Sequence, residues 1–194
     1  MIMILNGPPH CGKDTIANIL QNEYDVLHYS MKSSLIKAAA GVAGVSEGKL
    51  HMLLNNRDTK ETPLAGLAGL SPRKLLIHTS EAVVKPLFGK GVFGEREAER
   101  CKQAISEGHH SIVYSDGGFP EELQAMADVL GEDNILLVRL RRDGFTFDGD
   151  SRTYLDPIGD MPYLDIKLET GRPERAVQDI MSVHIQMLME KCNA

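Results

Sequence analysis

The stretch that decides the fold is Gly7-Pro8-Pro9-His10-Cys11-Gly12-Lys13-Asp14-Thr15, which fits the pattern GxxxxGK. An apolar run, residues 1–5, precedes it, and apolar residues at helical spacing follow it between residues 16 and 20. We therefore expect a short buried strand, a glycine-rich turn and a helix, which is the context that a phosphate-binding loop requires. In such a loop, backbone N–H groups and the helix N-terminus surround a polyphosphate, while the lysine reaches its terminal phosphates.

This pattern predicts that residues 7–15 bind ATP and that Lys13 is catalytic. The residue after the lysine is normally Ser or Thr, whose hydroxyl binds magnesium, whereas this chain has Asp14 followed by Thr15. A carboxylate can hold Mg²⁺ directly or through water, so Asp14 is a predicted metal ligand. The helix N-terminus is expected to lower the pKa of Cys11, and alkylation there is expected to block activity sterically. The alternative is a turn that merely ends a strand, with Lys13 and Asp14 in solvent.

The remaining pattern alternates between strands and helices. Further strands are expected at residues 25–29, 112–114, 135–140 and 163–168, with helices at about 14–21, 35–42, 71–89, 95–107, 121–130 and 173–191. This alternation predicts an α/β protein of three layers, in which a mostly parallel five-stranded sheet has helices on both faces. We interpret residues 44–70 as a loop or mobile excursion, within a larger excursion of about residues 44–107 that is expected to bind the acceptor substrate. Residues 143–162 are rich in glycine, proline and aspartate, and we expect a lid-like segment over about residues 141–162.

Composition narrows the class of protein. The chain has 194 residues, of which 42% are hydrophobic and 25% charged, as expected for a single globular domain spanning residues 1–194. Its formal net charge of −6 argues against binding a nucleic-acid polymer. No run approaches the roughly 20 apolar residues of a membrane span, so no membrane association is expected. Cys11, Cys101 and Cys192 have no zinc-type spacing, which indicates reduced thiols in the cytoplasm. The sequence leaves a homodimer open.

A second group of polar residues follows the strand at 112–114, in Ser115-Asp116-Gly117-Gly118. Ligands of open α/β sheets bind at the carboxyl ends of the strands, where Lys13 and Asp116 should both lie. Asp116 is therefore a predicted catalytic residue and metal ligand, which holds hydrated Mg²⁺ or accepts a hydrogen bond from substrate. A simple turn aspartate is the alternative.

Three arginines, Arg139, Arg141 and Arg142, lead into the candidate lid. Alternation along a strand puts Arg139 and Arg141 on one side and Arg142 on the other. Arginines from a closing lid stabilise the charge of a migrating phosphoryl group, so Arg141 or Arg142 is the expected catalytic cation. A solvated cationic strand end is the alternative.

These residues resemble a known family. The loop with Lys13-Asp14, the segment from Ser71-Pro72-Arg73 to Phe93, and residues 115–121 are similar to the deoxynucleoside monophosphate kinases of bacteriophages. The resemblance implies a P-loop kinase fold and transfer of the ATP γ-phosphate to a deoxynucleoside 5′-monophosphate. It touches most of the chain in order, but only the phosphate loop is a specific motif. Phosphomevalonate kinases and other small-molecule kinases share parts of it.

The resemblance also implies roles for single residues. Lys32, Arg73 and Lys85 would face the acceptor, and the Glu169-Thr170-Gly171 turn would border the donor base, which makes Gly171 a predicted ATP contact. His78 either reaches a substrate base or is a surface histidine.

Two positions depart from the family. Gly118 stands where the family commonly has arginine, so a clamp on the acceptor phosphate is either missing or supplied by Arg57, Lys60 or Arg73. Phe93 stands where the family often has tryptophan, which leaves the acceptor-base pocket undefined.

The sequence thus predicts a kinase for nucleoside monophosphates, with deoxynucleotides as the expected acceptors and ATP and Mg²⁺ as cofactors. Small nucleotides are its expected partners, and we expect a cytoplasmic location, in the host cytoplasm if the chain is of phage origin. A kinase for another small phosphorylated acceptor is the nearest alternative. A noncatalytic ATP-binding switch is a further alternative, because Gly118 and Asp14 both depart from the patterns of active kinases.

Overall fold

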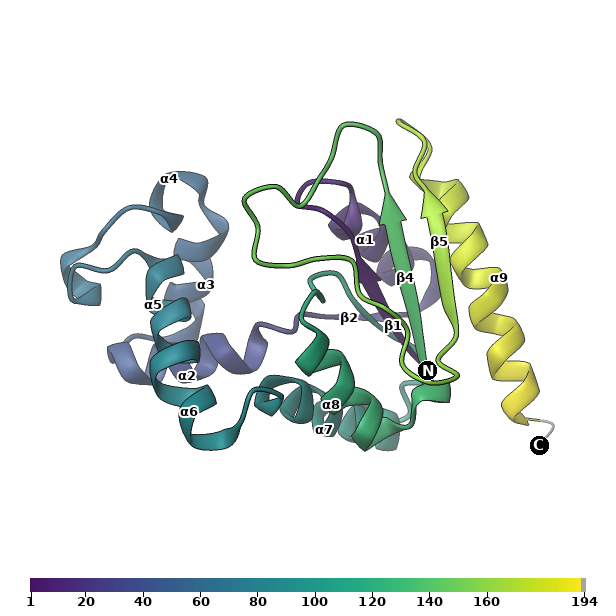
Figure 1. Ribbon diagram of the computed structural model, residues 1–194, viewed down its shortest axis with the longest axis horizontal. Coiled ribbons are helices and arrows are strands. Elements are labelled where there is room, and N and C mark those ends of the chain that lie inside the picture. The colour runs from purple at the N-terminus through teal and green to yellow at the C-terminus, as the bar shows by residue number, and fades with distance from the viewer. Residues whose placement is uncertain (193–194) are drawn as a thin grey trace.

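A five-stranded parallel sheet forms the centre of the computed structural model, which describes residues 1–192 (Figure 1). Its strands are β1 (Ile2–Asn6), β2 (Leu27–Tyr29), β3 (Ile112–Tyr114), β4 (Ile135–Arg141) and β5 (Tyr163–Lys167), in the order β2-β3-β1-β4-β5. The buried strand β1 is central, with Ile4 opposite Tyr114 on one side and Leu137 on the other. Its carboxyl end therefore meets the ends of β3 and β4, where the ligand site was expected.

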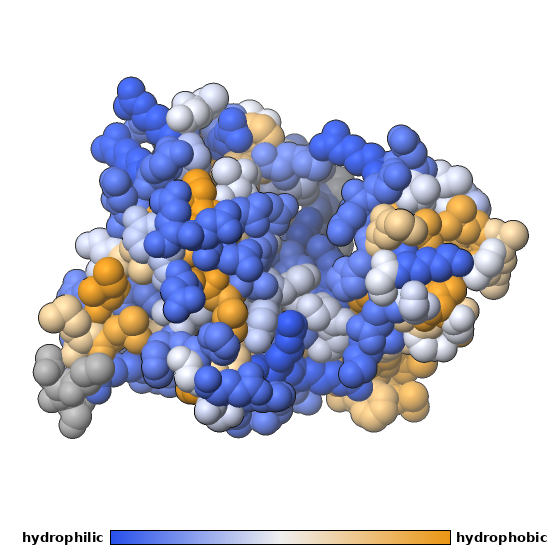
Figure 2. All heavy atoms as spheres, turned by 180° about the vertical axis from the view of Figure 1, so that it is seen from behind, coloured by the Kyte–Doolittle hydropathy of each residue, from blue (hydrophilic) through white to orange (hydrophobic). Residues whose placement is uncertain are grey.

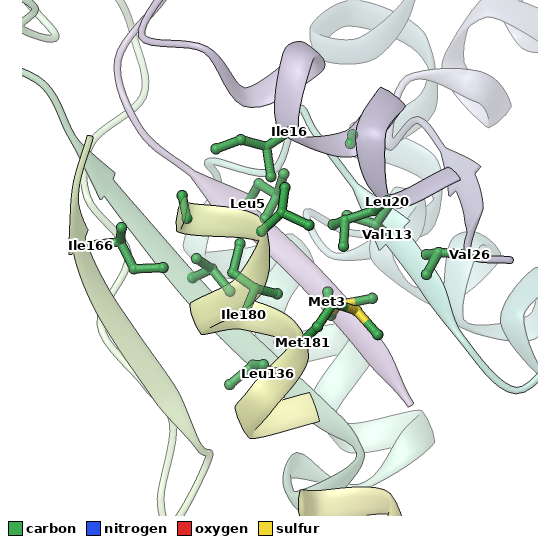
Figure 3. Close-up of a cluster of buried hydrophobic side chains, with 14 of the residues drawn as sticks. Met3, Leu5, Ile16, Leu20, Val26, Val113, Leu136, Ile166, Ile180 and Met181 are labelled. Atoms are coloured by element: carbon green, nitrogen blue, oxygen red, sulfur yellow. The ribbon is translucent and has the colours of Figure 1, made fainter. Parts of the chain in front are cut away.

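Helices cover both faces of the sheet, which confirms the three-layer α/β fold. Alternation along β1 sends Met3 and Leu5 to one face, where they pack under α1 (Lys13–Tyr24) and α9 (Pro173–Cys192) (Figure 3). Ile2 and Ile4 point to the other face, which is covered by α7 (Val92–Ser106) and α8 (Pro120–Leu130). A short 3₁₀ helix, η3 (Glu132–Asn134), leads from α8 into β4. None of the helices in residues 1–192 is long and apolar enough to cross a membrane.

A group of helices projects beside the sheet (Figure 1). It consists of α2 (Ser33–Ala43), α3 (Glu47–Asn55), α4 (Arg57–Lys60), the 3₁₀ helix η1 (Ala65–Leu67), α5 (Pro72–His78), the π-helix η2 (Thr79–Val84) and α6 (Lys85–Phe88). We call this group, residues 33–88, the helical excursion. The interpretation of residues 44–70 as a loop was wrong, because α3, α4 and η1 lie there.

The helices of the excursion form for two reasons. Ser46 and Asn56 cap α3 and α4, since their side chains accept hydrogen bonds from the backbone N–H groups of Lys49 and Asp58. Buried leucines and alanines of α2, α3, η1 and α5, with Leu50 at 0% exposure, then form a separate apolar cluster. The glycines and asparagines of this segment obscured that apolar spacing in the sequence.

The expected lid, residues 141–162, has two different halves. Residues 143–149 are mostly exposed, whereas Leu155 and Met161 are buried in the core. The buried side chain of Asn6, at the end of β1, accepts a hydrogen bond from the Leu155 N–H at 2.9 Å and donates to the Thr153 carbonyl at 3.1 Å. We call residues 150–155 the strap, because they are tied to the strand that carries the phosphate loop. Motion of residues 143–149 as a lid stays a prediction.

Candidate active site

The phosphate loop joins β1 to α1 in a tight turn of the backbone. Gly12 has a φ of 122°, which L residues rarely adopt. A Cβ on Gly7 would lie 2.7 Å from the Leu140 carbonyl oxygen and 2.9 Å from the Cys11 sulfur, so only glycine fits there. Lys13 folds back along this turn, and its Nζ donates hydrogen bonds of 2.7 Å to the carbonyls of Gly7 and Pro8. The strand, the glycine-rich turn and the helix thus follow one another as the sequence predicted, and the binding of phosphates by Lys13 stays a prediction.

Burial changes the chemistry of two side chains in the loop. The Lys13 side chain is 8% exposed, and burial is the main cause of its lowered pKa. The Cys11 thiol is fully buried, and burial raises its pKa, although the positive charge of Lys13 opposes this. The expected lowering of the Cys11 pKa was therefore wrong, because the side chain points into the apolar core instead of toward the helix N-terminus and solvent. His10 is exposed.

Hydrogen bonds connect the first turn of α1, which carries Asp14, with the residues after β3, which include Asp116. Asp14 accepts a 2.7 Å hydrogen bond from the Ser115 hydroxyl, which also lies 2.9 Å from Nε2 of His28. Asp116 is not a free turn residue, since it accepts hydrogen bonds from the Ser30 hydroxyl and the Met31 N–H, at 2.6 and 2.8 Å. Asp116 thus ties the end of β3 to the segment that enters the helical excursion.

The residues at this edge suit a hard cation. Within residues 1–192 no group of three or more His, Cys, Asp or Glu side chains is placed to hold a metal. Two carboxylates, Asp14 and Asp116, with the exposed Thr15 hydroxyl nearby in sequence, are nevertheless the oxygen donors that Mg²⁺ prefers. Mg²⁺ in phosphotransfer sites takes its other ligands from water and substrate phosphates, so the residues present fit this ion.

The arginines at the end of β4 have different partners. Arg139 and Arg141 both pair with Asp165 on β5, which agrees with their expected common side, and Arg141 also stacks on Tyr154. Arg142 instead approaches the phosphate loop, with Nη1 3.4 Å from the Cys11 carbonyl oxygen. Of the two predicted lid cations, the structure brings Arg142 to the loop, whereas Arg141, the last residue of β4, pairs with Asp165 of the neighbouring strand β5.

Arg142 also borders an open depression of about 430 Å³. The other lining residues are Asp143 and residues 167–170. Leu168 packs 3.7 Å from the position of a Cβ on Gly12, so the depression lies beside the phosphate loop. Gly171, with a φ of 76°, turns the chain immediately after it. The predicted contact of the 169–171 turn with the donor base is compatible with this position and stays a prediction.

The predicted acceptor residues lie at different distances from Asp116. Lys32 is 3.5 Å from Asp116, and Lys85 lies over the Phe119 ring and pairs with Glu81. Arg73 pairs with Glu61 on the excursion, and His78 is exposed on α5. Phe93, which is 2% exposed, packs with Val84 and Val92 as a core residue. Lys32 thus lies at the end of β3 and Lys85, on the excursion, contacts Phe119 beyond it. The pKa of Asp150 in the strap is lowered first by its bond with Arg152 and in smaller part by the charge of Arg73, so Arg73 also faces the strap.

Sequence reasoning missed two charged residues at this edge. Arg152 of the strap packs its aliphatic stem on Gly118, and its guanidinium pairs with Asp150. Glu122, in the first turn of α8, is 9% exposed, and its pKa is raised to about 7, first by burial and then by the charge of Asp116. The sequence signals that could have indicated Arg152 are Gly117-Gly118 after β3, which leaves room for a side chain, and the spacing Asp150-Ser151-Arg152, which allows a local ion pair.

The surface is hollowed between the sheet and the helical excursion, and mainly hydrophilic residues border the hollow (Figure 2). The carboxyl ends of β1 and β3 and the segment that leads into α2 supply charged groups to this side of the sheet. The site can thus bind a polyphosphate on the loop, hold a divalent cation at two carboxylates, and accept a second anionic molecule beside the excursion.

Comparison with known proteins identifies the fold. No protein-family model and no curated protein sequence matches this chain. An unliganded sugar kinase from Janibacter sp. HTCC2649 superposes with a TM-score of 0.52 and 12% identity, covering 93% of this chain and 92% of that chain. A shikimate kinase from Aquifex aeolicus has a TM-score of 0.41 and 16% identity, over 99% of this chain and 98% of that chain. The sheet order, the phosphate loop and the likeness to the sugar kinase show that this chain has a P-loop kinase fold.

Proposed function

We propose that this protein is a Mg²⁺- and ATP-dependent kinase that phosphorylates nucleoside 5′-monophosphates, with deoxynucleotides as preferred acceptors. The observation that carries the proposal is the meeting of the phosphate loop and Asp116 at one edge of the sheet, beside a hydrophilic hollow (Figure 2). The resemblance of residues 7–15, 71–93 and 115–121 to phage deoxynucleoside monophosphate kinases supports the choice of acceptor.

The donor is expected to bind on the phosphate loop. Two loop carbonyls accept hydrogen bonds from Lys13 in the structure, and the β- and γ-phosphates of ATP would take their place. Arg142, beside the Cys11 carbonyl, is the arginine on the donor side. Mg²⁺, when bound, neutralises charge on the phosphate oxygens, and Asp14 and Asp116 are the carboxylates that would hold it.

The chain itself acts by positioning and by charge. Phosphoryl transfer through a loose transition state needs no covalent enzyme intermediate, so aligned cations and the exclusion of water account for the catalysis. The Ser115 hydroxyl, which His28 contacts, donates to the Asp14 carboxylate, and the Ser30 hydroxyl and the Met31 N–H donate to that of Asp116. These contacts keep both carboxylates oriented before any substrate arrives.

The test is ADP release from Mg-ATP in the presence of each of dAMP, dGMP, dCMP, dTMP and the matching ribonucleotides. At least one deoxynucleotide is expected to stimulate release, and Lys13→Ala is expected to lower turnover by about 100-fold or more without unfolding the protein. Lys37→Ala, which removes an exposed lysine of α2, is the matched control and should leave turnover unchanged.

Other outcomes would identify a different acceptor or no acceptor. A monosaccharide and phosphomevalonate belong in the same panel, because the fold is also that of a sugar kinase and the motifs are shared with phosphomevalonate kinases. Stimulation by one of these alone would replace the nucleotide acceptor. Tight ATP binding without stimulation of ADP release by any acceptor in the panel would indicate a noncatalytic nucleotide switch.

A further inference from the structure

We infer that Arg152 binds the phosphate group of the acceptor and that Asp150 positions it for this role. This inference rests on the proposed function, in which a second phosphorylated molecule lies beside the ATP phosphates. Arg152 belongs to the strap, ten residues or more from the arginines that the sequence singled out at the end of β4. Three features of its surroundings support the inference: its packing on Gly118, its pairing with Asp150, and its place among other cations.

The first feature is the packing of the Arg152 stem. A Cβ on Gly118 would lie 2.6, 2.8 and 3.0 Å from Cδ, Cγ and Cβ of Arg152. The stem therefore occupies the volume that any side chain at position 118 would fill. Gly118 directly follows Asp116-Gly117 at the end of β3, so this packing puts Arg152 at the same edge of the sheet as the predicted metal ligand. Arg57, Lys60 and Arg73, the substitutes expected from the sequence, all belong to the excursion instead.

The second feature is the fork that Arg152 forms with Asp150. Nε donates to Oδ1 of Asp150 at 2.8 Å and Nη2 donates to Oδ2 at 2.7 Å, while the Arg152 backbone N–H donates to Oδ1 at 2.9 Å. A guanidinium has five N–H donors, and a bidentate carboxylate uses two of them. The pair therefore fixes the plane of the guanidinium and leaves donors for a second anion.

Hydrogen bonds tie the strap that carries this pair to the residue before the phosphate loop. Asn6 immediately precedes Gly7, and it bonds Thr153 and Leu155 as well as the Gly117 carbonyl, the last at 3.4 Å. One buried side chain thus connects the loop that receives ATP, the turn after β3 and the strap that carries Arg152. Arg152 is consequently preorganised, unlike an arginine that swings in with a lid.

The third feature is the electrostatic position of Arg152. Its charge contributes to the lowered pKa of Lys13 and to that of Lys60, although burial is the larger cause for both lysines. Asp116 and Glu122 raise the pKa of Arg152, after the larger effect of its bond with Asp150. Arg152 is therefore close enough to Lys13 of the donor site and to Lys60 of the excursion for its charge to act on both. Cations that repel one another around a hydrophilic hollow are stabilised when an anion binds between them.

The test measures binding and turnover separately. Wild type, Arg152→Ala and Arg96→Ala, an exposed arginine of α7 that serves as the matched control, are titrated calorimetrically with the nucleoside monophosphates, inorganic phosphate and a nonhydrolysable ATP analogue. Arg152→Ala is expected to weaken monophosphate binding by about tenfold or more and to change the Kd of the ATP analogue by less than about threefold. Inorganic phosphate should compete with the monophosphate in wild type and lose this ability in Arg152→Ala.

Three further variants separate binding from structural damage. Arg152→Lys keeps the stem and the charge but not the fork, so an intermediate loss is expected. Gly118→Ala displaces the stem while keeping the guanidinium. In a double variant with Arg152→Ala, it should add little to the loss of monophosphate affinity that Arg152→Ala causes alone. Asp150→Glu should recover part of the monophosphate affinity that Asp150→Ala loses, because the carboxylate is retained. Unfolding curves verify that each variant is folded.

Each outcome bears on one proposal. Monophosphate affinity of Arg152→Ala equal to that of wild type would overturn the inference, as would a wild type that binds neither monophosphates nor phosphate. Arg152-dependent monophosphate binding without turnover would remove the proposed kinase activity and leave this inference standing. Turnover with an acceptor KM that Arg152→Ala leaves unchanged would overturn this inference and leave the proposed kinase activity standing.

Discussion

Replacing Glu122 with glutamine is expected to stabilise the protein above neutral pH. Burial and the neighbouring charge of Asp116 raise the pKa of Glu122 from its ordinary value of 4.5 to about 7. Between these values the folded protein binds a proton that the unfolded chain releases, so the free energy of unfolding falls as pH rises from about 4.5 to about 7. The penalty is fully present above pH 7 and amounts to about 3 kcal/mol. Glutamine does not ionise, and the variant avoids this loss.

The assay is urea unfolding at pH 5 and pH 8, followed by circular dichroism. Glu122→Gln should be close to wild type at pH 5 and more stable at pH 8 by up to about 3 kcal/mol. Glu121→Gln is the matched control, because Glu121 is the adjacent but exposed residue of the same helical turn. Its charge is only a minor cause of the raised pKa of Glu122, after burial and Asp116, so Glu121→Gln should change stability at pH 8 far less than Glu122→Gln does.

A buried carboxylate that lowers stability at neutral pH is typical of a functional site. We therefore expect Glu122→Gln to impair acceptor-dependent turnover while it stabilises the fold. The reasoning is refuted if Glu122→Gln is no more stable than wild type at pH 8, or if it stabilises equally at both pH values. The second result would indicate better packing rather than removal of a buried charge.

Other substitutions test the packing that supports the site. Gly94→Ala should destabilise the protein by about 1–3 kcal/mol in urea unfolding, because a Cβ on α7 would collide with the backbone of Glu122 on α8; unchanged stability would contradict this close contact. Asn6→Ala should lower the free energy of unfolding by about 1–3 kcal/mol, since it leaves the backbone groups of the strap at Thr153 unpaired, and it should speed limited proteolysis there. Cys11 should react with iodoacetamide far more slowly in the folded protein than in urea, and equal rates would mean that the thiol is accessible.

Local patterns predicted most of the fold. The apolar run of β1, the glycines of the loop and the helical spacing of α1 are short-range signals, and each depends on residues only a few positions apart. The same holds for β3, β4 and α9, and the alternation of these elements predicted the parallel sheet. The helix α3 was missed because its buried Leu50 packs in a cluster that includes Leu75 and Leu76 of α5, about 25 positions away. The helix α4 was missed because Arg57–Lys60 contains no apolar residue that could show a helical spacing.

Burial explains the error at Cys11. The position of this residue beside a helix N-terminus predicted a lowered pKa, but the direction of its side chain depends on the core cluster under α1 and α9. The cost of removing the thiolate from water exceeds the attraction of Lys13 for it.

The sequence by itself determined the phosphate loop, the order of the five strands and of most helices along the chain, and the placement of Lys13 and Asp116 at one edge of the sheet. Only the tertiary structure decided which charged groups meet there. Arg142 contacts the loop while Arg141 pairs with β5, and Arg152 packs on Gly118 because Asn6 ties the strap to the end of β1. These contacts join residues separated by 24 to 147 positions, and they are set by packing and burial, which leave no periodic signal in the sequence.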